Sequence, residues 1–233
     1  LIVGDPRKIW LARHADIHLQ MKPGTDVWLL NALAHVIVTE DLVDHDFIRD
    51  HTEHFEDLRA NLLRYPPEEA EVVTGVPAEL IRKAARAYAT TKKAGIFYTL
   101  GITEHTHGTD NVYGLANLVL MTGHLGVRSA GMNPLRGQNN VQGANDAGVS
   151  PVFFPGYHSV GNPESQAHFE KAWGTELCDQ PGMNLNVMMK AMGCHGSVKG
   201  LYVMGEDILL SEPNASKITE GLETLDFLAV QDI

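Results

Sequence analysis

Short runs of β-branched and other apolar residues alternate along the chain with longer segments whose apolar positions repeat at helical spacing. Such alternation is typical of α/β proteins, in which crossover helices join parallel strands. Several of the short runs are apolar throughout, so we expect these strands to be covered on both faces and to lie in the core. The predicted strands are Leu1–Val3, Ile17–Gln20, Ile96–Leu100, Leu201–Met204 and Phe227–Val230.

Three longer segments have the apolar spacing of helices that pack on a sheet. The first covers 25–38, with Thr25 as a candidate N-cap and Asp26 in the first turn, where the helix dipole favours an acid. The second opens at Pro77, and the third covers 110–125. These helices would cover the predicted strands.

The chain changes character after the third helix. Residues 126–148 are rich in Gly, Asn, Pro and Gln and are the least core-like part of the sequence. Residues 150–200 are loop-like apart from two short helical patterns. We therefore expect an α/β fold of two αβα Rossmann-like lobes with mostly parallel sheets, one lobe over residues 1–137 and the other over 138–233.

Composition excludes several classes of function. Eighteen Lys and Arg against 29 Asp and Glu give a net charge of -11, which disfavours binding to nucleic acid. No apolar run reaches the roughly eighteen residues of a membrane span. The two cysteines, Cys178 and Cys194, cannot build a disulfide framework or an iron-sulfur site on their own. Both ends look like cuts through strands, so we expect an internal piece of a larger protein.

The segment NPLRGQNNVQGA, residues 133–144, carries the densest candidate chemistry. Its side-chain amides offer donors and acceptors in one plane, which suits the edges of heterocycles, and its glycines let the backbone approach a ligand closely. The guanidinium of Arg136 can bind a carboxylate through two parallel hydrogen bonds, a contact worth about 1.5–3 kcal/mol. The simpler interpretation is a polar loop that caps a helix beginning near Asn139.

Six motifs in order along the chain carry a family resemblance: GDPRKI at 4–9, KPGTD at 22–26, TGHLG at 122–126, NPLRGQNNVQGA at 133–144, VMGED at 203–207 and VQDI at 230–233. The chain resembles the catalytic subunits of molybdenum- or tungsten-dependent formate dehydrogenases, within the wider molybdopterin oxidoreductase family. The resemblance extends over essentially the whole chain, and the arginine segment, which follows the run GITEHTHG at 101–108, is the motif that points to formate.

The resemblance implies two molybdopterin guanine dinucleotides around one molybdenum or tungsten, with one dinucleotide assigned to each lobe, and oxidation of formate to carbon dioxide. Arg136 would be catalytic, orienting the formate carboxylate and stabilising charge near the metal, and Gln138 would contact a pterin. No metal ligand is assigned within this chain. The other residues that the resemblance assigns to the dinucleotides are Asp5, Arg7, Lys22, Gly24 and Asp26 for one, and Gly101, Thr103, Gly205, Glu206, Gln231 and Asp232 for the other.

The resemblance also implies parts outside this chain. In the family, the cysteines of an iron-sulfur cluster and the cysteine or selenocysteine that ligates the metal lie upstream of the GDPR motif. The fragment by itself should therefore be inactive and needs the remainder of the catalytic subunit, with electron-transfer subunits as further partners. The compartment is not determined, although the cytoplasm is favoured. The dipeptide Cys194-His195 follows the arginine segment, so we expect it to have a structural or surface role.

Three other interpretations stay open. Histidine pairs at short spacings could place two imidazoles on one metal, but no HExxH motif is present and we expect structural or surface roles for most of them. The chain could be a lobe that binds a nucleotide without redox chemistry. It could also belong to another molybdopterin oxidoreductase, such as one acting on nitrate, although a small carboxylate is what the fork of Arg136 suits. The pairs are His14 and His18, His51 and His54, and His105 and His107.

Overall fold

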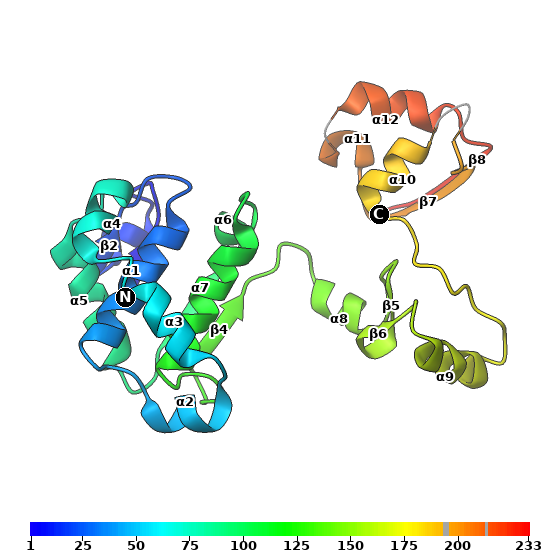
Figure 1. Ribbon diagram of the computed structural model, residues 1–233. Coiled ribbons are helices and arrows are strands. Elements are labelled where there is room, and N and C mark those ends of the chain that lie inside the picture. The colour runs from blue at the N-terminus through cyan, green and yellow to red at the C-terminus, as the bar shows by residue number, and fades with distance from the viewer. Residues whose placement is uncertain (193–195, 213) are drawn as a thin grey trace. The chain divides into compact units, whose positions relative to one another are not determined.

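The computed structural model describes residues 1–192, 196–212 and 214–233. The chain folds into two compact units, unit 1 at Leu1–Gly137 and unit 2 at Gln138–Ile233, and each has buried apolar clusters of its own (Figure 1). Within these described residues, no helix combines the length and the apolar character that crossing a membrane requires. The assignment of one dinucleotide to each unit stays a prediction.

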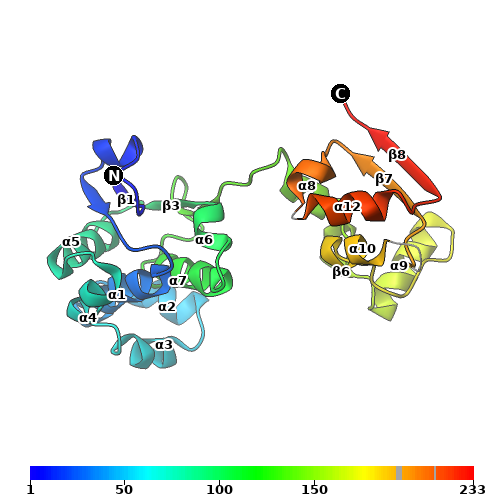
Figure 2. The ribbon, with the colours of Figure 1, turned by 90° about the horizontal axis from the view of Figure 1, so that it is seen from above.

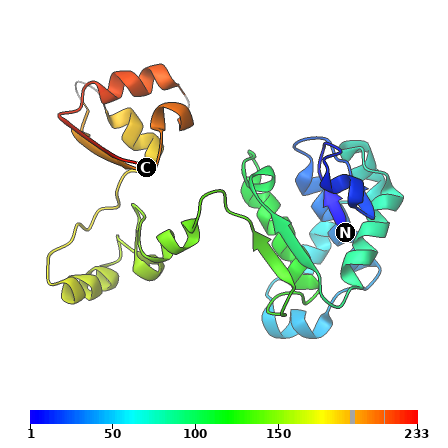
Figure 3. The ribbon, with the colours of Figure 1, turned by 180° about the vertical axis from the view of Figure 1, so that it is seen from behind.

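Unit 1 contains two pairs of parallel strands. They are β1 (Ile2–Gly4) with β2 (Ile17–Leu19), and β3 (Gly95–Tyr98) with β4 (Gly131–Pro134). Figure 3 shows β3 and β4 side by side. In both pairs the last residues are aligned, so that the segments that follow the two strands leave from the same edge.

Helix α1 is the centre of unit 1, and the other long helices pack around it. It is buried on nearly all sides, with Ala32 and Ile37 fully buried, because its sequence is apolar almost all round. The helices of unit 1 are η1 (Leu11–His14), α1 (Asp26–Thr39), α2 (His45–His51), α3 (Phe55–Leu62), α4 (Pro67–Thr74), α5 (Ala78–Ala89), α6 (Leu100–Thr103) and α7 (Gly108–Met121). Helices α3, α4, α5 and α7 contact α1 directly.

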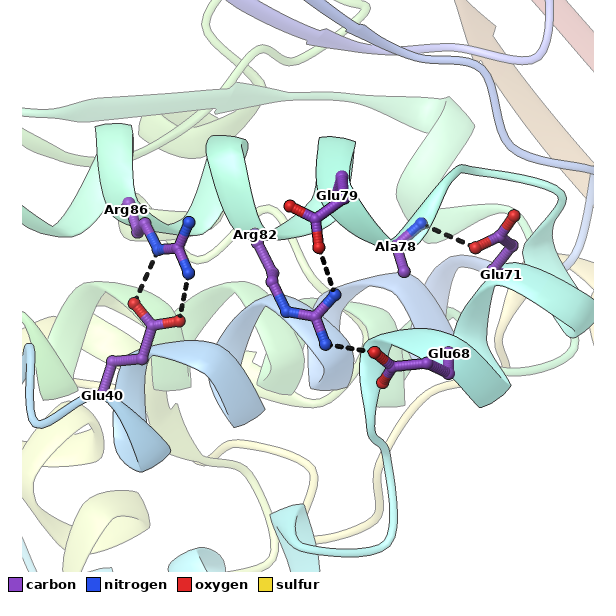
Figure 4. Close-up of polar contacts among 7 residues, drawn as sticks. All are labelled: Glu40, Glu68, Glu71, Ala78, Glu79, Arg82 and Arg86. Atoms are coloured by element: carbon purple, nitrogen blue, oxygen red, sulfur yellow. Dashed lines mark hydrogen bonds and ion pairs between the residues drawn. The ribbon is translucent and has the colours of Figure 1, made fainter.

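Ion pairs join α5 to α1 and α4 along one side of unit 1 (Figure 4). The Arg86 guanidinium donates to both carboxylate oxygens of Glu40, at 2.7 Å each. Arg82 donates to Glu79 at 2.9 Å and also to Glu68 of α4. These groups are partly exposed, so the pairs supplement the apolar core around α1 and do not replace it.

Unit 2 contains two smaller clusters. The first holds α8 (Val141–Asp146), the antiparallel strands β5 (Phe153–Phe154) and β6 (His158–Ser159) with the turn η2 (Pro155–Tyr157), and α9 (Pro163–Trp173). The second holds α10 (Leu185–Ala191), the parallel strands β7 (Gly200–Met204) and β8 (Phe227–Gln231), α11 (Ile208–Ser211) and α12 (Ala215–Leu222). Figure 2 shows β7 and β8 side by side. Alternate residues of β7, Leu201 and Val203, are buried in the second cluster.

The α/β class and the mostly parallel pairing are confirmed. The five predicted strands correspond to β1, β2, β3, β7 and β8, with ends that shift by one or two residues. The three predicted packing helices correspond to α1, α5 and α7, and the two short helical patterns to α9 and α10. Periodicity alone therefore located most of the elements that carry the candidate motifs.

Two expectations were wrong, and one strand was not predicted. Burial of apolar strands on both faces fails for β3, β7 and β8: each lies in a two-stranded sheet, and Phe97 and Phe227 are 68% and 65% exposed. Thr25 precedes α1, but its hydroxyl donates to Lys22 O and caps no helix N–H. The Gly- and Asn-rich segment contains an unpredicted strand, β4. A helix does begin near Asn139, since α8 starts at Val141, although the side chain of Asn140 makes no cap hydrogen bond to it.

Removing the guanidinium of Arg86 should weaken the junction of α1 and α5 in a pH-dependent way. The hydrogen bond from Arg86 holds the pKa of Glu40 below its ordinary value of 4.5, against the opposing effect of burial. A carboxyl whose pKa is lower in the folded state stabilises the fold above its unfolded pKa, and this contribution is lost as the pH falls through the folded pKa. Arg86→Met should therefore lower Tm slightly at pH 7.

The difference in Tm between Arg86→Met and the unaltered protein should shrink as the pH falls below 4.5. Arg59→Met is the matched control, because Arg59 pairs at 3.8 Å with Glu56 of its own helix and joins no other element. Thermal unfolding at a series of pH values measures both variants. A deficit for Arg86→Met that is the same at pH 3 and pH 7 would contradict this account.

Candidate functional site

The sequence-predicted site residues lie at or just beyond the carboxyl ends of the parallel strands, where open α/β sheets bind nucleotides. The structure brings them together in three places, which we name the first edge (β1 and β2), the second edge (β3 and β4) and the third edge (β7 and β8). Asp5, Arg7, Lys22, Gly24 and Asp26 lie at the first edge, Gly101, Thr103 and Arg136 at the second, and Gly205, Glu206, Gln231 and Asp232 at the third, while Gln138 is the first residue of unit 2.

At the first edge, hydrogen bonds join the residues that follow β1 to β2. Asp5 N donates to Leu19 O at 3.3 Å, and the ring Nε2 of His18 lies 2.9 Å from Asp5 O. The Asp5 carboxylate accepts from Arg7 N at 2.7 Å, which turns the chain directly after β1. The side chain of Arg7 is exposed and makes no ion pair with the described residues.

The KPGTD turn of the first edge rests on the end of α4. Lys22 N donates to Thr74 O at 2.8 Å, and Lys22 Nζ donates to Val72 O at 3.3 Å. The ammonium of Lys22 is therefore already engaged by a carbonyl of its own chain. Gly24 has a φ of +79° with nothing near its Cβ position, so the turn requires a left-handed residue and leaves open space above it.

Asp26 is the unusual group of the first edge. It opens α1, it is 5% exposed, and its carboxylate makes no hydrogen bond or ion pair within the described part of the chain. The positive end of the α1 dipole lies beside Asp26 and favours its negative charge. A buried carboxylate without a protein partner is suited to accept donors from a ligand.

The second edge places two segments that are far apart in sequence beside each other. Tyr98 is aligned with Pro134, and Leu135 N extends the ladder by donating to Tyr98 O at 2.8 Å. Arg136 is the next residue after this hydrogen bond. Its side chain is exposed and makes no hydrogen bond or ion pair with the described residues, which leaves its planar fork of donors free.

The turn that carries Gly101 and Thr103 is held against α7. A Cβ on Gly108 would lie 2.0 Å from Thr103 O, so only glycine allows this approach. Asn111, 2% exposed, donates from Nδ2 to Ile102 O at 2.9 Å. The sequence analysis did not single out Asn111, although an amide inside the apolar repeat of 110–125 signals a buried hydrogen bond.

The TGHLG motif packs behind the second edge and has no free functional group. Thr122 Oγ1 donates to Leu118 O at 2.7 Å, and His124, 3% exposed, lies edge-on to the ring of Tyr88 with centroids 5.2 Å apart. Burial raises the pKa of Tyr88 to about 12, which keeps its hydroxyl protonated. The motif therefore supports the junction of α5 and α7.

At the third edge, a backbone hydrogen bond likewise joins the residue that follows β7 to β8. The polar side chains at this edge have hydrogen-bond partners in unit 2. Gly205 N donates to Gln231 O at 2.9 Å. The hydroxyl of Tyr202 donates to the side chain of Gln231, and Ser211 Oγ donates to Glu206 at 2.9 Å. Gln138, the first residue of unit 2, is exposed.

The two histidines of each predicted pair contact different residues. In the described ranges, no group of three His, Cys, Asp or Glu side chains is placed to hold a metal ion. Cys194 and His195 lie outside the described residues. The ring contacts are His14 with Trp10, His18 with Asp5 O, His51 with Phe47, His54 with Asp57, His105 with Gly101 O and His107 with Asp110.

Comparison with known families identifies the family of the chain. A family model described as molybdopterin oxidoreductase matches residues 1–233, the whole chain. The chain belongs to the molybdopterin oxidoreductase family. Membership in this family implies a molybdopterin cofactor that carries molybdenum or tungsten.

Individual relatives match over the full length of the chain. It is 44% identical over 233 residues to the F420-dependent formate dehydrogenase subunit alpha of Methanocaldococcus jannaschii, covering 100% of this chain and 34% of the relative. It is 44% identical over 234 residues to formate dehydrogenase H of Escherichia coli, covering 100% of this chain and 33% of that protein. The chain thus spans about a third of the length of these relatives.

A solved structure has the same fold. Acetylene hydratase from Pelobacter acetylenicus superposes with a TM-score of 0.72 at 22% identity, covering 99% of this chain and 34% of that one. At this identity the likeness concerns the fold alone. It supports the parallel α/β arrangement on which the three edges depend.

Gly131 should be the glycine on which the second edge depends. It opens β4 with a φ of +99°, a conformation in which an L side chain is strained. Gly131→Ala should lower the free energy of unfolding by about 1 kcal/mol or more. Gly137→Ala is the matched control, since Gly137 has no left-handed backbone and nothing near its Cβ position. Denaturant unfolding compares them, and equal stability of the two variants would contradict the assignment of strain.

Proposed function

We propose that this chain is part of the catalytic subunit of a formate dehydrogenase, which oxidises formate to carbon dioxide at a molybdenum or tungsten centre held by two molybdopterin guanine dinucleotides. The observation that carries the proposal is the position of Arg136, with its guanidinium free, directly beyond the β3–β4 ladder. The two relatives that are 44% identical over the whole chain are named as formate dehydrogenases, which supports formate as the substrate.

Arg136 supplies what a small carboxylate needs. Its planar guanidinium presents parallel N–H donors to the two oxygens of formate and neutralises their charge, whereas a Lys ammonium would act as a point charge. Because the donors have no protein partner among the described residues, binding breaks no ion pair within the chain. Held in this way, formate would present its C–H bond in one orientation, away from the guanidinium.

The first edge fits a guanine dinucleotide. The buried Asp26 carboxylate has room for two donors, which is what the N–H groups of a guanine edge offer. Gly24 leaves open space next to it, and Arg7 contributes an exposed cation suited to a phosphate. Asp5 and Lys22 shape this edge through backbone and carbonyl contacts.

We assign the remaining predicted residues to the same cofactor. Gly101 has an ordinary φ and nothing within 4 Å of its Cβ position, so packing within the chain does not explain a glycine there, and close approach of a ligand would. At the third edge the backbone of Gly205 and the polar groups beyond Gln231 would face the second dinucleotide. When bound, the metal-pterin group supplies an acceptor for the two electrons that formate loses.

Parts of the proposed enzyme lie outside this chain. The chain spans about a third of its relatives and contains only two cysteines, so the ligands of an iron-sulfur cluster would come from the rest of the subunit. We propose that this cluster passes the electrons to separate electron-transfer subunits. A cytoplasmic location belongs to the same proposal.

Replacing Arg136 should slow formate oxidation specifically. Arg136→Ala in the intact enzyme should lower kcat/KM for formate by at least about tenfold, equivalent to about 1.4 kcal/mol. Arg136→Lys keeps the charge but loses the fork, so its kcat/KM should fall between those of the wild type and Arg136→Ala. Steady-state kinetics with formate, and with nitrate as the alternative substrate, measure the effect. Unchanged formate kinetics would remove Arg136 from the mechanism.

Replacing Asp26 should lower the dinucleotide content of the intact subunit. Asp26→Asn loses a charged acceptor worth about 1.5–3 kcal/mol to its donors, so bound guanine and metal should fall about tenfold or more at limiting cofactor. Asp57→Asn, the same change on the exposed face of α3, is the control. Metal analysis together with pterin and guanine content gives the answer. Full loading of Asp26→Asn would contradict the site, and zinc without pterin in the wild type would overturn the function.

A further inference from the structure

An asparagine occupies the middle of β4, where strand propensity disfavours it. Asn133 is aligned with Phe97 of β3 and is half-buried. Asparagine is depleted in strands because its amide competes with the backbone for hydrogen bonds. In the sequence this amide looked like one of several that could read the edge of a heterocycle. In the structure, the Asn133 amide instead donates hydrogen bonds to backbone carbonyls.

Both donors of the Asn133 amide are directed to backbone carbonyls. Nδ2 donates to Ile96 O of β3 at 3.3 Å and to Gly131 O, at the start of β4, at 3.1 Å. One contact crosses between the strands, and the other closes back on its own strand. The side chain thus ties the first residue of β4 to the interior of β3, independently of the ladder.

The two hydrogen bonds of Asn133 matter because the pairing of β3 with β4 is short. Only four residue pairs are aligned between β3 and β4, and β4 starts at the left-handed Gly131 and ends at Pro134, which has no N–H to donate. A slip by one residue would move every side chain of β4 to the opposite face. Arg136 follows two residues after β4, so the register of the strand decides where its guanidinium lies.

We propose that Asn133 is a positioning residue for Arg136: its amide bridge between Ile96 and Gly131 holds the register of β4 and thereby the direction in which the guanidinium leaves the sheet. This inference rests on the proposed role of Arg136 in binding formate. Asn133 itself does not touch the substrate. Its donors are satisfied by the backbone, so its contribution should appear only through Arg136.

A double-mutant cycle in the intact enzyme tests this dependence. Asn133→Asp keeps the size of the side chain but turns the two donor contacts into repulsion between oxygens. It should raise the KM for formate about tenfold or more, because a displaced guanidinium orients formate poorly, while the KM for the electron acceptor stays unchanged. In the Arg136→Ala background, the same substitution should change formate kcat/KM by less than about twofold.

Controls separate positioning from folding. Asn61→Asp makes the same chemical change on the exposed side of α3, where the amide has no hydrogen bond to the described residues, and should leave the kinetics unaltered. Metal and pterin content are measured for every variant and should stay at the wild-type level. Asn133→Ala removes the donors without adding charge. It should also raise the KM for formate, by less than Asn133→Asp does.

The outcomes distinguish the inference from the function on which it rests. If Arg136→Ala leaves formate kinetics unchanged, the proposed function fails. If Arg136→Ala has its expected effect but Asn133→Asp lowers kcat/KM equally in both backgrounds, the positioning role alone is wrong. Loss of metal and pterin in both Asn133 variants would also overturn it, since the amide would then serve the fold as a whole.

Discussion

Parallel pairing of short strands is the interaction on which the candidate site depends. Two parallel strands end at the same edge, so their backbone ladder brings together loops that are distant in the sequence. The pairing of β3 with β4 places the arginine segment beside the turn that carries Gly101, and the pairing of β1 with β2 places the KPGTD turn beside the GDPR turn. The backbone ladders therefore bring the motifs together, and the Asn133 amide adds hydrogen bonds to the pairing of β3 with β4.

The stability that supports these edges comes from elsewhere in unit 1. Helix α1 is buried on almost every side, and each fully buried aliphatic side chain of the kind represented by Ile37 and Ile81 contributes about 1.5–3 kcal/mol. The partly exposed ion pairs of Arg82 and Arg86 add less. Because the core supplies most of the stability, the segments beyond the strand ends can keep groups without partners among the described residues, namely the carboxylate of Asp26 and the guanidinium of Arg136.

The two groups differ in what they indicate. Asp26 is 5% exposed and has no hydrogen bond or ion pair among the described residues, so its carboxylate can accept the donors of a ligand. An exposed arginine costs little, and its significance comes from its position beyond the β3–β4 ladder and from the family to which the chain belongs. By contrast, Lys22, Glu206 and Gln231 are engaged within the chain, so their roles toward a cofactor would require these contacts to be shared or exchanged.

The sequence by itself determined the α/β class, five strands, the main packing helices and the family, because apolar periodicity and ordered motifs are local properties that survive without coordinates. Only the tertiary structure revealed β4, whose residues have neither alternation nor β-branched side chains and form a strand solely because β3 lies beside them. It alone showed that the amide of Asn133 binds backbone carbonyls and that Asp26 is buried without a partner. Hydrogen-bond partners and burial depend on which segments meet in space, and residue identity cannot specify this.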